Sequence, residues 1–188
     1  MKKLIVIIVL VVKCHILLSQ ENNLVVFFAD AITSGIPVYS NDTNTDTIAV
    51  VKEYPEKENW HDVELLGQSK NRYKVRIIAI NENDVAPIVG WVDKDQCGVW
   101  LHSRYIEPQF FIVELYSKPG QLKPFMTLKS KNCYNIDDTT DAYCKAVPVL
   151  DYKYCNGKYW IKTAIYKNRK RMEVWTTNYC PNIYDSCS

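Results

Sequence analysis

Glycine and histidine are scarce in this chain, and their scarcity excludes several kinds of site. The 188 residues include six glycines and three histidines. The glycines form neither the G-x-x-x-x-G-K loop of nucleotide phosphate sites nor the G-x-G-x-x-G turn of dinucleotide-binding folds. No two cysteines have the C-x-x-C spacing that is typical of zinc sites. The sequence therefore predicts no bound nucleotide, no metal and no other cofactor.

Catalytic patterns are missing as well. A cysteine nucleophile needs a histidine base within reach, and Cys97 lies five residues before His102. No helix is predicted there to lower the pKa of the thiol, so we interpret Cys97 as a disulfide partner or a small buried residue. The carboxylates of Glu64, Asp93 and Asp95 show no pattern that would place them across a groove, as glycoside cleavage requires. We expect that the protein is not an enzyme.

Helical periodicity is also absent, and the patterns that are present favour β-strands. Tyr73, Val75 and Ile77 alternate with basic residues, which is typical of a strand with one buried face. Thirteen tyrosines and five tryptophans suit strands. Hairpin connections are predicted at 68–71 and at Asn156-Gly157, where both residues tolerate a positive φ. The predicted fold class is all-β.

The first residues indicate export. Met1–Lys3 is a short cationic start, and Leu4–Val12 is a run of nine apolar residues. Such a run is too short to span a bilayer but is typical of a secretory signal. We expect residues 1–20 to be a signal peptide, and the processed chain to be periplasmic or extracellular without a stable membrane span. A retained lipid anchor at Cys14 is the alternative, although Lys13 stands where such processing needs a small residue.

Neither sign of charge dominates the processed chain. Loss of Lys2, Lys3 and Lys13 with the signal leaves 20 basic residues against 21 acidic ones, a net charge of −1. Nucleic acids and anionic membranes attract strongly basic surfaces. We therefore expect neither of them as a partner.

The cysteines fit an oxidising compartment. Of the seven, Cys14 lies in the signal, and five of the other six follow residue 130. An even number of cysteines in an exported chain favours disulfides, but six allow 15 connectivities and the spacing does not select one. The disulfide candidates are Cys133 with Cys144 and Cys180 with Cys187.

Several short motifs recur in the same order along the chain. Their spacings lie between 77 and 86 residues: Phe27-Phe28 returns as Phe110-Phe111, 38–40 as 115–117, 71–77 as 157–163, Trp91 as Trp175 and Cys97 as Cys180. Features that keep their order at nearly constant spacing indicate a duplicated unit. We predict two domains, 24–107 and 108–188, of which the second is rich in cysteine.

The recurring motifs carry a family resemblance. "PVYS" at 37–40, "VELLGQSKNRYKVRI" at 63–77 and "GWV" at 90–92 resemble the bacterial SH3-like domain, SH3b. In that family a strand leads into a long irregular loop, a hairpin follows, and a Gly-Trp-Val strand closes a small barrel. The second copy is similar, with "ELYSKPG" at 114–120 and "AVPVLDYKYCNGKYWIK" at 146–162. The resemblance implies two small β-barrels in tandem.

The tryptophans of the closing strands are predicted to lie in the core. These residues are Trp91 and Trp175. The second copy departs from the family pattern, because Val174 replaces the glycine before the tryptophan and insertions such as 133–144 lengthen its loops. The groove that the family uses is therefore expected to be altered in the second copy.

The resemblance also implies a function. SH3-like folds bind ligands in grooves lined with aromatic side chains, since flat rings offer a large contact area at small entropic cost. We expect a non-catalytic binding or scaffold module of the cell envelope that recognises peptidoglycan or a peptide. The implied partner is a cell-wall glycopeptide or an envelope protein. The candidate ligand-binding residues are Tyr39, Trp100, Tyr116 and Trp160.

Two features leave alternatives open. The run "YKNRKR" at 166–171 is expected at a hairpin tip, where Lys167, Arg169, Lys170 and Arg171 could contact an anionic polymer or lipid headgroup. The same run could simply be a solvated turn whose charges keep a sheet edge soluble. The cysteine-rich second half fits an inhibitor or interaction protein, braced by disulfides, that acts on an envelope or extracellular partner.

Overall fold

The computed structural model describes residues 23–29, 31, 34–54, 60–80, 85–101, 104–106, 110–130, 146–167 and 169–180. The expected signal peptide at 1–20 lies outside these residues. Most of the described residues belong to β-strands, and the one helical element that they contain is a 3₁₀ turn at Lys94–Gln96. The all-β fold class is confirmed.

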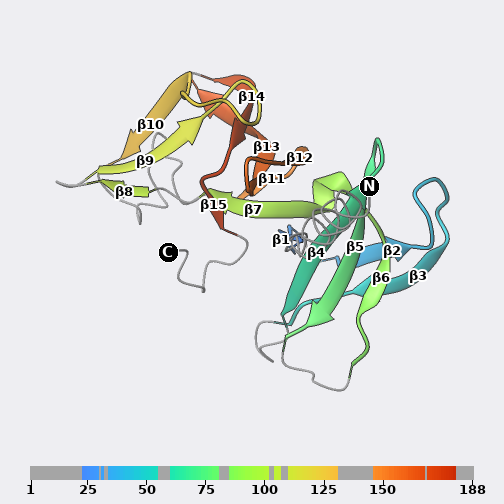
Figure 1. Cartoon of the computed structure of the whole chain (residues 1–188). Helices are drawn as coiled ribbons and strands as arrows, with labels where there is room; N and C mark the ends of the chain where they lie inside the picture. Colours follow the sequence, from blue (N-terminus) through green and yellow to red (C-terminus); the bar gives the residue numbers. More distant parts are fainter. Residues whose placement is uncertain are drawn as a thin grey trace, which may run out of the picture.

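The described residues form fifteen strands, which Figure 1 shows in chain order by colour. The first half contributes β1 (Leu24–Phe28), β2 (Ile36–Tyr39), β3 (Thr47–Val51), β4 (His61–Gln68), β5 (Arg72–Ala79), β6 (Ile88–Asp93) and β7 (Cys97–Leu101). The second half contributes β8 (Arg104–Ile106), β9 (Phe110–Leu115), β10 (Met126–Ser130), β11 (Ala146–Pro148), β12 (Asp151–Cys155), β13 (Lys158–Lys167), β14 (Lys170–Thr176) and β15 (Tyr179–Cys180).

The strands form one large sheet and two small ones. The large sheet has the order β11-β7-β1-β4-β5-β6-β2-β3, and β15 also pairs with β7. The small sheets are β10-β9-β8 and β12-β13-β14. Among the described strands no pairing joins β3 to β11, so the large sheet is open. The closed small barrels that the resemblance implies are not found in the described part of the chain.

The local sequence patterns form the hairpins that were predicted from them. On β5, Tyr73, Val75 and Ile77 are each at most 2% exposed, and the basic residues between them face outward. The hairpin of β12 and β13 turns at Asn156 and Gly157, whose φ angles are 55° and 78°. Two consecutive positive φ angles match the twist of the flanking strands, which is why Asn-Gly is favoured at this turn.

Strand β7 connects the two halves of the chain. One of its edges pairs with β1 and with β15, and the other edge pairs with β11. Figure 1 shows β7 running between the two groups of strands. Its side chains Cys97, Val99 and Leu101 are at most 1% exposed and belong to one buried cluster with residues from both halves. The two halves therefore share a hydrophobic core at β7.

The prediction that Trp91 and Trp175 lie in the core is wrong. Both tryptophans are half-buried, whereas the neighbouring Val92 and Val174 are fully buried. Successive side chains of a strand point to opposite faces of the sheet, so a buried valine directs the adjacent tryptophan away from the core. The two tryptophans therefore lie on outer faces.

Two hairpins far apart in the sequence have the same register. Adding 77 to the residue numbers of a pair in the first hairpin gives a pair in the second. The pairs Ile36–Val51 and Val38–Ala49 of β2–β3 thus correspond to Val113–Leu128 and Leu115–Met126 of β9–β10. The next residue is Tyr39 in the first hairpin and Tyr116 in the second. Each tyrosine pairs with a tryptophan of a later strand, Trp91 or Trp175. The two hairpins thus have the same loop length, and each pairs with a tryptophan of its own half of the chain.

Candidate functional site

The outer face of β2 and β6 carries two aromatic residues side by side. Tyr39 and Trp91 are directly opposite each other in the antiparallel pair, so their side chains lie on the same face of the sheet. Both are half-buried, while the inward-facing Val38 and Val92 are fully buried. The core valines therefore hold the sheet in place and leave the two rings partly accessible.

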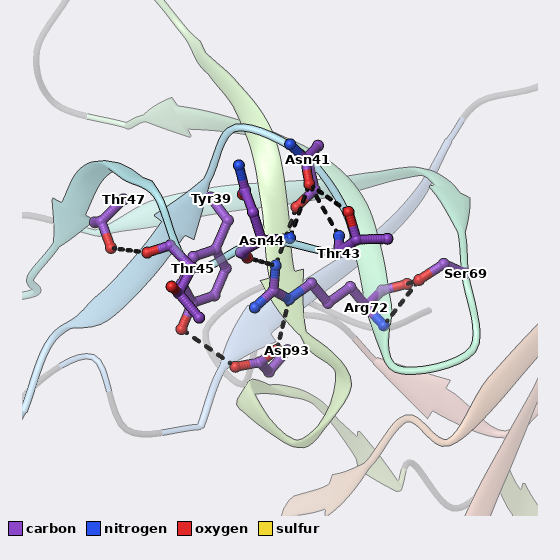
Figure 2. A network of polar contacts seen from close by, with 9 residues as sticks. All are labelled: Tyr39, Asn41, Thr43, Asn44, Thr45, Thr47, Ser69, Arg72 and Asp93. Atoms are coloured by element: carbon purple, nitrogen blue, oxygen red, sulfur yellow. Dashed lines mark hydrogen bonds and ion pairs between the residues drawn. The ribbon is translucent and has the colours of Figure 1, made fainter.

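Arg72 braces this aromatic pair from β5. It lies opposite Asp93 of β6, and its Nε donates to Asp93 Oδ1 over 2.9 Å. Its guanidinium carbon lies 3.7 Å from the ring centroid of Tyr39, which is cation–π geometry. Figure 2 shows the arginine extended between the tyrosine, the aspartate and the loop that follows β2. Arg72 is only 8% exposed, so its charge is balanced by these contacts instead of by water.

The loop after β2 is held by its own side chains and by Arg72. Asn41 Oδ1 accepts hydrogen bonds from the backbone N–H of Thr43 at 3.0 Å and of Asn44 at 2.9 Å, an Asx-type turn. The Arg72 Nη1 donates to the carbonyl oxygens of Asn41 and Asn44 (Figure 2). Because a guanidinium has several fixed donors, one side chain satisfies two loop carbonyls and a carboxylate. The loop is therefore ordered next to the aromatic pair.

The phenol of Tyr39 stays neutral in this setting. Burial raises its pKa, the Asp93 carboxylate raises it further, and the Arg72 charge partly offsets the increase. Its hydroxyl lies 3.4 Å from Asp93 Oδ2 and donates to it. The site therefore presents a neutral ring beside a closed ion pair.

Apolar side chains extend the aromatic pair across the sheet. Val50 of β3 is 56% exposed and lies opposite Pro37 of β2, and Val89 of β6 is 47% exposed. Val89 is two residues from Trp91 and therefore points to the same face. We call the surface formed by Tyr39, Trp91, Val50 and Val89, with Arg72 at its edge, the Tyr39 face.

The four rings predicted from the sequence are not brought together at one site. Trp100 is half-buried and stacks on Phe27 across β1 and β7, with ring centroids 5.6 Å apart. Tyr116 is 7% exposed and Trp160 is 3% exposed, and they contact each other edge to face at 4.9 Å. Tyr39 contacts Arg72 instead. Of the four candidates, Tyr39 and Trp100 thus retain partly accessible rings.

The basic run forms the expected hairpin tip between β13 and β14. Lys167 lies opposite Lys170, and Arg169 has a φ of 62° in the turn. Arg171 is neutralised in part, because its Nη1 lies 2.8 Å from Glu173 Oε1. Hydrogen bonds from Lys162 and Arg171 lower the pKa of Glu173. Within the described part of the chain, Lys167, Arg169 and Lys170 of this run have no ion pair.

The cysteines differ in state. Cys97 is buried with a free thiol, and burial raises its pKa, so it remains protonated and unreactive. Cys155 also carries a free thiol and is half-buried. Cys180 is disulfide-bonded, and no disulfide joins two cysteines of the described part. The remaining disulfide candidates, Cys133, Cys144 and Cys187, lie outside the described residues, as does His102.

A row of tyrosines was not predicted from the sequence. Tyr73 is buried and contacts Tyr152, which contacts Tyr159, which contacts Tyr154, with centroid distances between 5.0 and 6.0 Å. Tyr154 is 42% exposed, so the row leads from the core to the surface. The signal was present in the sequence, since Tyr152 and Tyr154 alternate on one strand and share a face.

Comparison with known proteins found no match. No family model matches the chain, and no curated protein or solved structure matches it either. Within the described residues no helix has the length and apolar character needed to cross a membrane. In the same part of the chain, no three metal-ligating side chains of histidine, cysteine or acidic type are grouped together.

Proposed function

We propose that this protein is a non-catalytic binding or scaffold module that is exported to the cell envelope. In this proposal residues 24–107 and 108–188 are two SH3-like units, and the ligand is peptidoglycan or an envelope peptide. The apolar run at 4–12 supports export. The proposal of two units is supported by the hairpins β2–β3 and β9–β10, which share register and each place a tyrosine against a tryptophan.

The observation that carries the binding function is the Tyr39 face. Tyr39 and Trp91 are half-buried neighbours on the sheet, and Arg72 and the ordered loop fix one side of the tyrosine. Rings that are already held in place lose little entropy when a ligand packs on them. The ion pair of Arg72 with Asp93 is already closed, so the face suits a ligand that is apolar or neutral where it touches the rings.

Sedimentation with purified cell-wall sacculi tests this proposal. The wild-type protein should appear in the pellet, and Tyr39→Ala should reduce the bound fraction at least about tenfold, the loss expected when an anchoring ring is removed. The matched control is Tyr166→Ala, which removes a tyrosine that is 71% exposed and far along the chain from the Tyr39 face. Equal binding of Tyr39→Ala and wild type, with both folded by circular dichroism, would contradict the assignment of the ligand to this face.

A second candidate function is an inhibitor or interaction protein of the envelope. The exposed valines Val50 and Val89 beside the rings favour it, because apolar and aromatic side chains together are typical of the centre of protein interfaces. The two functions separate in one experiment. An interaction protein would stay in the supernatant with bare sacculi and would be retained by envelope proteins, and Tyr39→Ala would abolish that retention.

A further inference from the structure

The near-neutral charge of the processed chain is the sum of two unlike halves. Residues 24–107 include 8 basic and 13 acidic residues, a net charge of −5, whereas residues 108–188 include 12 basic and 7 acidic residues, a net charge of +5. Such an asymmetry indicates that the basic half faces an anionic partner. The expectation that no anionic membrane is a partner used the total charge alone, in which the two halves cancel.

The tip of the β13–β14 hairpin carries basic side chains that nothing in the described part of the chain neutralises. Lys167, Arg169 and Lys170 are exposed and have no ion pair there. Glu173 of β14 already binds Arg171 at 2.8 Å. Lys167 lies directly opposite Lys170, and like charges in that position destabilise a ladder. An anionic partner at the tip would relieve this repulsion.

Apolar side chains lie beside the basic tip. Lys167 Nζ is 3.5 Å from Met126 Sδ, which brings the tip against the first residue of β10. Phe125 precedes Met126 and is 47% exposed, and Leu122, in the loop between β9 and β10, is 94% exposed. Leu122 is four residues before Met126, so the Cα atoms of these two residues are at most about 14 Å apart. The basic tip and the two apolar side chains therefore belong to one exposed region.

The exposure of Leu122 distinguishes between kinds of anionic partner. A leucine that is 94% exposed removes almost no apolar area from water on folding, so it contributes little to stability. Lys123 beside it is exposed as well. Apolar side chains surrounded by basic ones are typical of segments that lie on anionic membranes, where the apolar groups reach the acyl boundary and the basic groups stay among the headgroups. A soluble anionic polymer would be bound by the charges alone and would give Leu122 no role.

We propose that this region docks on a membrane that contains acidic phospholipid. The lysines and the arginine contact the headgroup phosphates, and the two apolar side chains enter the boundary between headgroups and acyl chains. The membrane charge repels the acidic first half, which carries the Tyr39 face, and so holds it away from the lipid. The docking itself does not depend on the proposed function. The docking residues are Leu122, Lys123, Phe125, Lys167, Arg169 and Lys170.

Cosedimentation of the processed protein with lipid vesicles tests the docking. Vesicles of phosphatidylcholine and phosphatidylglycerol in equal amounts should bind the wild type at least about tenfold more tightly than vesicles of phosphatidylcholine alone, because several basic residues act together at an anionic surface. Added salt should weaken this binding. The vesicles contain no wall polymer, so a failure here would leave the proposed wall binding intact, and a failure with sacculi would leave the docking intact.

Two double variants locate the contact. Lys167→Ser with Lys170→Ser should weaken binding to the acidic vesicles at least about tenfold, whereas Lys153→Ser with Lys158→Ser should bind like the wild type. Each pair removes two exposed lysines. Lys158 and Lys167 are the two ends of β13, which puts them about 30 Å apart. That distance exceeds the Debye length of about 8 Å at physiological salt, so the control pair lies outside the contact.

Leu122→Ser separates a lipid surface from a soluble polyanion. It should weaken binding to the acidic vesicles at least about fivefold, because an apolar group no longer enters the bilayer. The control is Val85→Ser, which removes an apolar side chain that is 51% exposed in the first half and should leave binding unchanged. The proposal is overturned if the wild type binds both kinds of vesicle equally or binds neither, or if the variant pair at the tip binds like the wild type. If Leu122→Ser keeps full binding, the region recognises anionic polymers by charge alone and the lipid proposal is wrong.

Discussion

The two halves of the chain place a tyrosine opposite a tryptophan in the same way, but they cover that tyrosine differently. In the first half the guanidinium of Arg72 lies 3.7 Å from the Tyr39 ring centroid, and the ring stays half-exposed. In the second half the indole of Trp160 meets Tyr116 edge to face at 4.9 Å, and Tyr116 is 7% exposed. The cation–π contact of Arg72 in the first half thus takes the place of the ring contact of Trp160 in the second.

Arg72 and Trp160 occupy equivalent places in their strands. Arg72 lies two residues before Lys74, which pairs with Trp91, and Trp160 lies two residues before Lys162, which pairs with Trp175. The same strand position therefore accepts either an arginine that hydrogen-bonds a loop or a tryptophan that packs against the tyrosine. The arginine leaves Tyr39 partly accessible, whereas the tryptophan buries Tyr116 and contributes to stability.

The largest effect is expected at Trp160. Trp160→Ala removes a side chain that is 3% exposed and leaves a cavity beside Tyr116, so the free energy of unfolding should fall by about 3–5 kcal/mol. Chemical denaturation followed by fluorescence measures this loss. The comparison between the halves fails if the variant is as stable as the wild type, because Trp160 would then not be a packing residue.

A smaller effect is expected at Arg72. Arg72→Leu leaves Asp93 and two loop carbonyls without their donor, at a cost of about 2 kcal/mol in the free energy of unfolding. The control is Arg76→Leu on the same strand, whose exposed ion pair with Glu64 should contribute less than about 1 kcal/mol. Sacculus binding should weaken with Arg72→Leu as well, because the loop and the Tyr39 ring lose their support. Equal stability of the two variants would show that the hydrogen bonds of Arg72 to Asp93 and the loop do not stabilise the fold.

The smallest effect on stability is expected at the basic hairpin tip. Replacing Arg169, Lys170 and Arg171 together by serine should change the free energy of unfolding by less than about 1 kcal/mol, because these residues are on the surface. If the second half contacts an anionic polymer, binding to sacculi should weaken at low salt and converge with the wild type at high salt. Identical binding at every ionic strength would assign these charges to solvation of the turn.

Local patterns in the sequence were sufficient to predict the all-β class and the hairpins β4–β5 and β12–β13. The alternation on β5 and the Asn156-Gly157 turn depend on neighbouring residues alone, so a few consecutive residues are enough to predict them. The inward direction assigned to Trp91 and Trp175 was wrong because it was based on their place in the closing strands and not on the alternation of side chains. Val92 and Val174 carry the correct signal, since a buried valine requires that the adjacent side chain face outward.

Contacts between distant segments could not be predicted in this way. Arg72 follows a basic, outward-facing pattern, yet it is buried because a loop 28–31 residues earlier in the chain folds over it. Tyr116 and Trp160 were candidates for an accessible surface, and their burial depends on the isolated bridge between Tyr116, just after β9, and Trp175 of β14. The sharing of β7 between the halves likewise depends on register between strands that are far apart in the sequence.

Sacculus binding by the matched pair Trp91→Ala and Trp175→Ala tests the central claim most directly. Both variants remove a half-buried tryptophan that pairs with a tyrosine, one from each half. We predict that Trp91→Ala loses binding at least about tenfold, as removal of a central aromatic contact does, while Trp175→Ala binds like the wild type. Equal losses in the two variants, or a loss in Trp175→Ala alone, would contradict the assignment of recognition to the Tyr39 face.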